Sequence, residues 1–316
     1  MSSSAPSPRR ILVVKLGAFG DFVVALAAMK AIRQTHADAH LTLLTTPPFV
    51  GLAEASGLFD AVRGDGRPSG FAGQVRLALD LRRARFDRVY DLQRNDRTRL
   101  FFHVLRFGRP GLEWSGIFPG ATFYIADPRE PRRHAAVRYA DQLRVAGITV
   151  PPYPDLGFLH GDLTPLPPLP ERFVLLVPGG APQRPAKRAP VATYVSLARH
   201  CLGQGLTPVL VGTDKEADVL DAIALAVPEA LSLRGRTDFG QLASLARRAA
   251  GAVGNDTGPM HLVAVAGCPS VVLFSAESDP VENRPWADQV VTLQRPHLRD
   301  LPADEVAAAL DGVVRG

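Results

Sequence analysis

Three short segments of the 316-residue chain place charged residues and glycines where a buried strand is expected to give way to a helix. They read "KLGAFGD", which ends at Asp21, "VPGGAPQRPAKR", which ends at Arg188, and "GNDTGPMH", which ends at His261. A carboxylate at such a junction can accept a proton, whereas cationic side chains and free backbone N–H groups can bind an anion. The segments are therefore the candidate sites for chemistry.

The first segment has two interpretations. Gly17 and Gly20 let the backbone turn tightly off the strand, and Asp21 stands in the first turn of the following helix. Asp21 is then either the residue that caps the helix N-terminus or a carboxylate that faces a cleft and accepts a proton. The spacing of the glycines does not match GxGxxG, which argues against a nicotinamide cofactor.

The other two segments have the character of anion sites. In "VPGGAPQRPAKRAP", Lys187 and Arg188 precede a helix, and the segment is either a phosphate-binding loop or a solvated basic turn. In "NDTGPMH", an Asp or Thr cap, Gly258 and a proline in the first turn make a well-formed helix start, where N–H groups and the helix dipole favour an anion. His261 is either a structural histidine or a ligand contact.

The elements that must position these segments follow an α/β pattern. Short apolar runs such as "RILVVKL", "HLTLLTT", "RFVLLVP" and "TPVLVGT" alternate with helical patterns, which predicts two Rossmann-like, doubly wound domains with a cleft between them. Seven prolines in residues 151–171 indicate a connection between the domains. We expect a first domain over 1–160, a linker over 161–171 and a second domain over 172–316, with a last helix that packs on either domain.

Composition and charge narrow the class of protein. Two cysteines without a CxxC partner exclude a disulfide framework and a zinc site, and no run is apolar enough to cross a membrane, so we expect a cytoplasmic protein. The net charge is +5, and the excess of arginine and lysine lies in the first half. That half is therefore expected to meet an anionic partner. Nucleic acid is not expected, because aromatic residues are not interleaved with the basic ones.

Taken together, the segments resemble glycosyltransferase family 9, the lipopolysaccharide heptosyltransferases. The similarity lies in "ILVVKLGAFGDFVVAL", "YDLQRNDRTR", "PGGAPQRPAKRAP" and above all "NDTGPMHLVAVAGCP", which occur in the family's order along the whole chain. The resemblance implies a GT-B fold, with the acceptor bound by the first domain and a nucleotide-sugar donor by the second. It also implies inverting, metal-independent transfer of a heptose from ADP-L-glycero-D-manno-heptose to an inner-core sugar, with no cofactor.

The resemblance also implies roles for individual residues. Asp21 takes the position of the general base and Lys187 that of the lysine on the departing diphosphate. The implied donor-binding residues are Gly179, Lys187, Arg188, Glu216, Asp256, Thr257, Gly258 and His261. The implied acceptor is an anionic glycolipid of the Kdo-lipid A type, reached by peripheral contact with the inner membrane. The residues expected to meet it are Gly17, Gly20, Arg94, Arg97, Arg99, Arg132 and Arg133.

Two departures from the family pattern leave the sugar open. The chain has "ALAAM" where the family usually has Thr-Leu-Pro, and Ala189 stands where a tryptophan follows the lysine. Three alternatives therefore remain: a GT-B transferase that uses another nucleotide sugar for a surface glycan, a nucleotide-sugar epimerase, and a non-catalytic nucleotide-sugar-binding protein.

Overall fold

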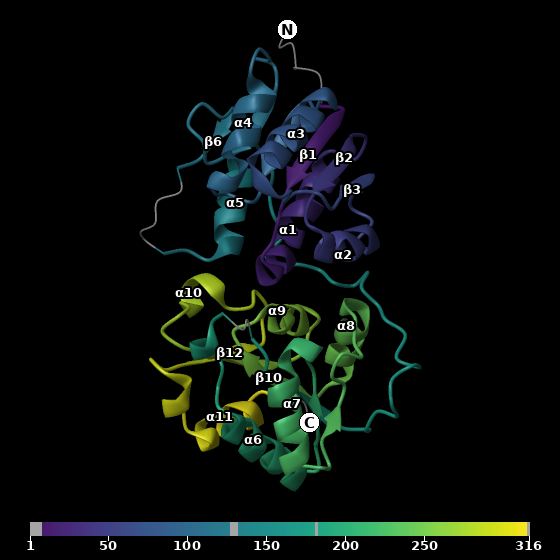
Figure 1. Cartoon of the computed structure of the whole chain (residues 1–316), viewed down its shortest axis with the longest axis vertical. Coiled ribbons are helices and arrows are strands. Elements are labelled where there is room, and N and C mark those ends of the chain that lie inside the picture. Colours follow the sequence, from purple (N-terminus) through teal and green to yellow (C-terminus); the bar gives the residue numbers. More distant parts are fainter. Residues whose placement is uncertain (1–7, 127–131, 181–182, 315–316) are drawn as a thin grey trace. The chain divides into compact units, whose positions relative to one another are not determined.

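The structure of the protein is a computed structural model that describes residues 8–126, 132–180 and 183–314. The chain divides into two compact units, residues 1–154 and 155–316. Each unit is built on its own six-stranded sheet, in which every strand pair is parallel (Figure 1).

The first unit has the strand order β3-β2-β1-β4-β5-β6. Its strands are β1 (Arg10–Val14), β2 (His40–Leu44), β3 (Ala61–Arg63), β4 (Arg88–Asp91), β5 (Glu113–Gly116) and β6 (Phe123–Tyr124). Its helices are α1 (Phe19–Thr35), α2 (Val50–Ala55), α3 (Gly70–Arg83), α4 (Arg99–Arg106) and α5 (Ala135–Val145), with 3-10 turns at Pro47–Phe49 and Asp96–Thr98.

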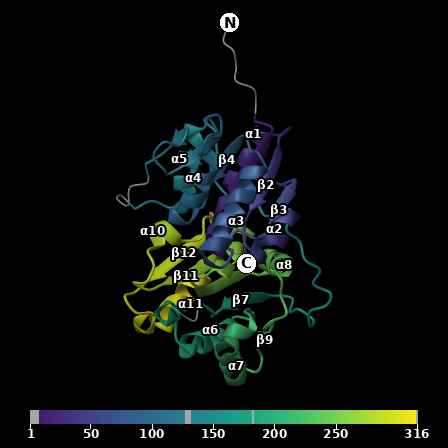
Figure 2. The same cartoon turned by 45° about the horizontal axis from the view of Figure 1, so that its top comes forward.

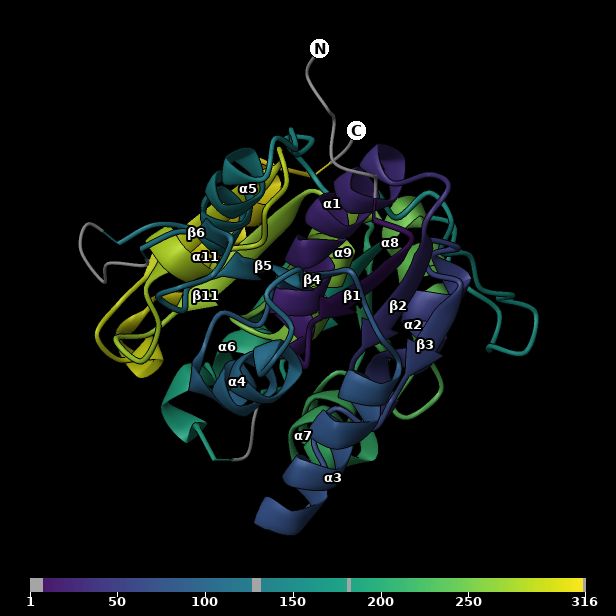
Figure 3. The same cartoon turned by 90° about the horizontal axis from the view of Figure 1, so that it is seen from above.

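Helices cover both faces of the first sheet. Seen along the strands, α1 and α5 lie on one face and α3 and α4 on the other (Figure 3). The central strand β1 is a continuous apolar run because both of its faces are buried. Under α3 and α4, the rings of Phe102 and Trp114 pack edge to face with centroids 5.2 Å apart. Each such ring stabilises the unit by roughly 2–3 kcal/mol through burial.

The second unit has the strand order β12-β11-β10-β7-β8-β9. Its strands are β7 (Phe173–Val177), β8 (Thr207–Leu210), β9 (Leu231–Ser232), β10 (Gly251–Asn255), β11 (Ser270–Phe274) and β12 (Val290–Gln294). Its helices are α6 (Val191–Gly203), α7 (Ala217–Ala226), α8 (Phe239–Arg248), α9 (Gly258–Val265), α10 (Pro280–Asn283) and α11 (Ala303–Asp311), with 3-10 turns at Pro185–Lys187, Asp214–Glu216 and Leu298–Asp300.

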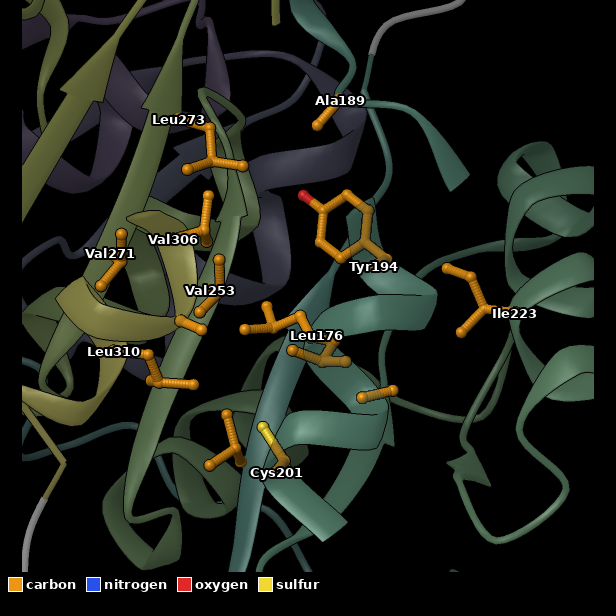
Figure 4. Packing of buried hydrophobic residues seen from close by; sticks show 14 of the residues in the cluster. Leu176, Ala189, Tyr194, Cys201, Ile223, Val253, Val271, Leu273, Val306 and Leu310 are labelled. Atoms are coloured by element: carbon orange, nitrogen blue, oxygen red, sulfur yellow. The ribbon is translucent and has the colours of Figure 1, made fainter. Parts of the chain in front are cut away.

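The core of the second unit lies between its sheet and the helices α6, α7 and α11, which lie side by side in Figure 2. Leu176 from β7, Val253 from β10 and Leu310 from α11 meet there (Figure 4). Tyr194 of α6 is fully buried in this cluster, and its hydroxyl group donates a hydrogen bond of 3.1 Å to Asn255 Oδ1. This bond connects the core to the end of β10, where a candidate site begins.

Numbered within each unit, the strands share one order, 3-2-1-4-5-6, which is that of the Rossmann fold. The prediction of two doubly wound α/β domains is thus confirmed. The expected elements do not include β5, β6 and α5 of the first unit or α10 and β12 of the second. The strand β5 carries the polar residues Glu113 and Ser115, and β6 has only two residues, so neither stands out as an apolar run.

The division between the units falls at Pro154 and Asp155, before the expected linker over 161–171. The linker residues are bound to the second unit: Gly161 N donates to Ser244 Oγ at 3.0 Å, and Gln241 Nε2 donates to Asp162 O at 2.9 Å. Both partners lie on α8, so the proline-rich segment packs as part of this unit. The last helix, α11, packs on β10, β11 and α6 of the second unit.

Candidate functional site

The carboxylate of Asp21 stands in the first turn of α1, directly after the end of β1. The helix begins at Phe19 and its N-cap is Ala18, which makes no side-chain cap bond. The interpretation of Asp21 as the N-cap is therefore wrong. Among the described residues, no hydrogen-bonding or ion-pair partner engages this half-buried carboxylate, so its oxygens are available to a ligand.

An open pocket of about 730 Å³ surrounds Asp21 in the first unit. Its walls come from segments that follow β1, β2, β3 and β4, the edge at which open α/β sheets bind ligands. The lining residues are Leu16, Gly17, Ala18, Asp21, Thr46, Pro48, Phe49, Arg67, Gln93, Asn95, Asp96 and Arg97. The structure thus brings the predicted residues Gly17, Asp21 and Arg97 together.

Gly17 has a backbone that favours glycine, with φ of +119°. A Cβ atom at this position would lie 3.0 Å from the ring of Phe49. That ring stacks on Phe22 of α1, with centroids 5.0 Å apart, so it has little freedom to move away. The wall of the pocket beside Asp21 is therefore held by close backbone-to-ring packing.

Two arginines, Arg67 and Arg97, line the pocket together with the carboxylates of Asp21 and Asp96. Burial and the neighbouring guanidinium of Arg97 lower the pKa of Arg67 below its usual value, because both disfavour a second positive charge. Neither guanidinium forms an ion pair in the part of the chain that the structure describes. Two close cations without a counter-ion favour an anionic ligand.

Arg67 is a pocket residue that the sequence analysis did not identify. It lies in "RGDGRP", a segment that has the composition of a turn. Its place along the chain could have identified it, because the segment directly follows β3 and therefore lies at the carboxyl edge of the sheet.

The other predicted acceptor residues lie elsewhere in the first unit. Gly20 is buried within α1. Arg94 Nη1 donates to Gln142 Oε1 at 2.8 Å and to Arg138 O at 3.2 Å, and Arg133 forms an ion pair with Asp141. Arg132 is exposed, and Arg99 pairs with Asp96 at 2.6 Å. None of these five is among the residues that line the pocket.

In the second unit, Asn255 organises the predicted donor loops. It is the fully buried last residue of β10. Its Nδ2 donates to Pro178 O at 2.8 Å and to Gly179 O at 3.0 Å, while its Oδ1 accepts from Ala189 N at 3.0 Å. One amide therefore binds both ends of the loop that carries Lys187. The sequence pattern around Asn255 did not indicate this role, because the bonded groups lie 66 to 77 residues away along the chain.

Lys187 and Asp256 are brought together from the second and third motifs. Lys187 Nζ lies 2.5 Å from Asp256 Oδ2, and both side chains are largely buried, at 13% and 7% exposure. Arg188 donates to the carbonyl oxygen of Gly180. A phosphate at this point meets a cation whose position is already fixed, which reduces the cost of ordering it. Residues 181 and 182 of the loop lie outside the described part of the chain.

Helix α9 begins at Gly258, with Thr257 as its N-cap and Pro259 in its first turn. The side chain of Thr257 makes no cap bond, and its buried Oγ1 has no partner in the described structure. A buried hydroxyl without a partner is costly and favours a ligand that bonds to it. His261 is on the same helix and only 7% exposed.

Glu216 lies beside Gly179, in the loop that carries Lys187. Its Cγ is 2.7 Å from the position that a Cβ atom on Gly179 would occupy, so the two segments pack without space for a side chain. Glu216 Oε2 accepts from Thr213 N at 2.9 Å in a capping box at the start of the 3-10 turn Asp214–Glu216, which precedes α7. One of its oxygens thus has a structural bond.

The described residues contain no group of three or more His, Cys, Asp and Glu side chains that could hold a metal ion. Within the same residues, no helix is long and apolar enough to cross a membrane.

Known proteins share both sequence and fold with the chain. Lipooligosaccharide heptosyltransferase 2 of Haemophilus influenzae is 31% identical over 129 residues, which are 39% of this chain and only 37% of that relative. The structure of E. coli ADP-heptose LPS heptosyltransferase II superposes with a TM-score of 0.76 at 19% identity, covering 96% of this chain and 98% of the other. The glycosyltransferase family 9 structure from Veillonella parvula gives 0.79 at 19% identity, covering 96% and 97%.

These matches confirm the GT-B fold. The model of glycosyltransferase family 9 (heptosyltransferase) matches residues 74–311, which is most of the chain and includes the second and third motifs. The chain therefore belongs to glycosyltransferase family 9.

Proposed function

We propose that the protein is an inverting, metal-independent glycosyltransferase. It transfers a heptose from ADP-L-glycero-D-manno-heptose to a sugar of the lipopolysaccharide inner core. Membership of family 9 and the H. influenzae heptosyltransferase relative support the reaction class. The observation that carries the proposal is the pocket of the first unit, which contains the carboxylate of Asp21 and two arginines. None of these three groups has an ion-pair partner among residues 8–126, 132–180 and 183–314.

In this proposal Asp21 is the general base. Its carboxylate accepts the proton of the acceptor hydroxyl while that oxygen forms a bond to the anomeric carbon of the heptose. The bond from the same carbon to the diphosphate breaks on the opposite face, so the configuration inverts. The lack of other partners for Asp21 supports this role, because its oxygens do not have to give up a hydrogen bond to accept the proton.

The departing diphosphate takes the electron pair of the broken bond. We assign its stabilisation to Lys187 and to the N-terminal end of α9 at Thr257 and Gly258, where the helix dipole is positive. Gly179, Arg188, Asp256 and His261 complete the proposed donor site, and Glu216 is assigned to the ribose. A lysine and a helix terminus neutralise the developing charge, so the proposed reaction requires no divalent ion and no cofactor.

The acceptor is proposed to be an anionic glycolipid of the Kdo-lipid A type. Arg67 and Arg97 bind its carboxylate or phosphate groups, since two close guanidinium groups suit such oxyanions. Arg94, Arg99, Arg132 and Arg133 remain predicted acceptor contacts, as does the backbone at Gly17 and Gly20. A lipid-linked acceptor places the enzyme at the cytoplasmic face of the inner membrane, in peripheral contact with it.

The test is transfer from a panel of nucleotide sugars to a Kdo-lipid A acceptor, followed by mass spectrometry. We expect heptosylated acceptor and ADP in equal amounts from ADP-heptose, and no product from UDP- or GDP-sugars. Preferred use of a UDP- or GDP-sugar contradicts the donor assignment. Conversion of a nucleotide sugar to an epimer without acceptor identifies an epimerase instead, and binding without turnover identifies a non-catalytic protein.

A further inference from the structure

Asp91 is a fully buried carboxylate at the end of β4. Its Oδ1 accepts hydrogen bonds from the backbone N–H groups of Gln93 at 3.1 Å and Arg94 at 3.4 Å. Its Oδ2 accepts from the hydroxyl of Thr98 at 2.5 Å. The two oxygens therefore bind the beginning and the end of one short segment, residues 93–98.

This segment forms one wall of the pocket around Asp21. Four of its residues, Gln93, Asn95, Asp96 and Arg97, line the pocket. The segment is also joined to the end of β1, because Leu16 N donates to Gln93 Oε1 at 2.8 Å. Any movement of residues 93–98 therefore moves the guanidinium of Arg97 and disturbs the strand end that leads to Asp21.

The backbone of the segment is one that must be held in place. Arg94 has a φ of +54°, a region that non-glycine residues seldom occupy because it is strained. It is held there by the bond from its N–H to Asp91 and by its side-chain bond to Gln142. Gln142 Nε2 in turn donates to the carbonyl oxygen of Asp91 at 3.1 Å.

Burying an ionised carboxylate at this position is energetically unfavourable. Burial raises the pKa of Asp91 to about 6, because the charged form loses its solvation. Buried loops can be held by neutral groups, as Asn255 does in the second unit. The charged form has a specific advantage here: it accepts several hydrogen bonds at once and thereby fixes a segment that presents an arginine.

We propose that Asp91 is a positioning residue for the acceptor site: its carboxylate holds residues 93–98 so that Arg97 and Asn95 face the anionic acceptor beside Asp21. The inference rests on the proposed function, since it takes the pocket as the acceptor site. Asp91 does not touch substrate, and it acts through the residues that it binds. It should therefore control acceptor binding and leave the donor site unchanged.

Two variants test this role. Asp91→Ala removes all three side-chain bonds, whereas Asp91→Asn keeps one acceptor oxygen for the backbone N–H groups and an N–H group for Thr98 Oγ1. Tyr90→Phe is the matched control: it removes a hydroxyl group from the preceding, equally buried residue, whose bonds go to His36 and Arg88 and not to the segment. All three variants are first checked for folding by circular dichroism and thermal unfolding.

Steady-state kinetics with both substrates should separate the variants. For Asp91→Ala we expect the KM for the acceptor to rise about tenfold or more, the size of effect that loss of a charged contact produces. We expect kcat to change less than about threefold and the KM for the donor to stay the same. Asp91→Asn should recover most of the loss, and Tyr90→Phe should resemble the wild type. An unchanged acceptor KM in folded Asp91→Ala overturns the proposal, as does an equal rise for acceptor and donor.

Hydrogen exchange provides a readout that does not depend on heptose transfer. Peptides covering 93–98 should exchange faster in Asp91→Ala, while peptides of the second unit keep their rates. If the wild type transfers no heptose, the proposed function fails. Calorimetric titration with inorganic phosphate then replaces the acceptor KM: weaker phosphate binding in Asp91→Ala supports the positioning role, and equal binding overturns it.

Discussion

Asp91 and Asn255 occupy corresponding places in the two units, and they solve the same problem with different chemistry. Each is the buried last residue of the fourth strand of its unit, β4 or β10. Asp91 binds the segment that directly follows β4, whereas Asn255 binds the loop that follows the neighbouring strand β7. Asn255 uses a neutral amide that both donates and accepts, whereas Asp91 uses a carboxylate that only accepts when ionised. Asn255 meets two carbonyl oxygens and one N–H group, so it must donate and accept. Asp91 meets two N–H groups and a hydroxyl group, so it needs only to accept.

The charges around these two residues differ as well. In the second unit the lysine of the site is paired with Asp256. In the first unit the carboxylate of Asp21 and the guanidinium groups of Arg67 and Arg97 share one pocket, and none of them forms an ion pair with another described residue. In the proposed reaction, the first site accepts a proton and binds an anionic acceptor, whereas the second binds the diphosphate through a lysine that is already held by Asp256.

The largest expected effect is that of Asp21→Asn. The amide cannot accept the proton of the acceptor hydroxyl, so kcat should fall by about 10³-fold. ADP affinity, measured by calorimetry, should stay within about twofold of the wild type, because the proposed donor site belongs to the second unit. Full activity in this variant removes Asp21 from the mechanism.

Replacing Asn255 tests whether its neutral amide holds the loop that carries Lys187. Asn255→Leu leaves two carbonyl groups and one N–H group of the donor loops without their partner. We expect the free energy of unfolding to fall by about 3 kcal/mol, measured by urea denaturation, and ADP binding to be lost. Ser270→Ala, a buried polar substitution on the neighbouring β11, serves as the control. Retained ADP affinity in Asn255→Leu shows that the loops do not depend on this amide.

The pH dependence of stability tests whether the buried carboxylate of Asp91 titrates as its surroundings predict. Burial raises the pKa of Asp91 to about 6, so between pH 4 and 6 the folded chain binds a proton that the unfolded chain releases. Protonated Asp91 therefore stabilises the folded chain below pH 4. This stabilisation is lost as the pH rises through 6, and the free energy of unfolding falls by up to about 3 kcal/mol. The difference in unfolding free energy between wild type and Asp91→Asn should change accordingly. A constant difference across this range means that Asp91 does not titrate there.

Lys187→Met should weaken ADP binding by about 10- to 100-fold. The substitution removes the cation on the diphosphate and leaves the buried carboxylate of Asp256 without its partner. The double variant Lys187→Met/Asp256→Asn separates these two causes. If it recovers most of the affinity, the loss came from the uncompensated carboxylate; if it does not, it came from the missing contact with the diphosphate.

The smallest effect is expected from single arginines of the first pocket. Arg67→Gln should raise the acceptor KM about tenfold with little change in kcat, since the group binds an anion and does not take part in bond making. Arg83→Gln is the control, because Arg83 is exposed, is already paired with Asp80 and does not line this pocket. Equal behaviour of the two variants argues against an acceptor site at Arg67.

Sequence alone predicted the two doubly wound units and the three strand-to-helix junctions, because apolar runs and glycine- or proline-rich turns are local features. It could not predict that Gln93 binds Leu16, since this bond depends on the pairing of β1 with β4. Nor could it predict that Asp91 binds Thr98, since this bond depends on the irregular backbone of residues 93–98. Arg67 was missed because a turn-like composition hides what lies beside it in space. The unit boundary was misplaced for a similar reason: a proline-rich segment reads as a connection, although Gly161 and Asp162 are bound to α8.

The repeated strand order has a consequence for how this chain can change. Each half closes its own sheet and core, so the loops at one carboxyl edge can diverge without disturbing the other half. Exchange of either half between related enzymes should therefore yield folded chimaeras. Such recombination would let the specificities for donor and acceptor evolve independently.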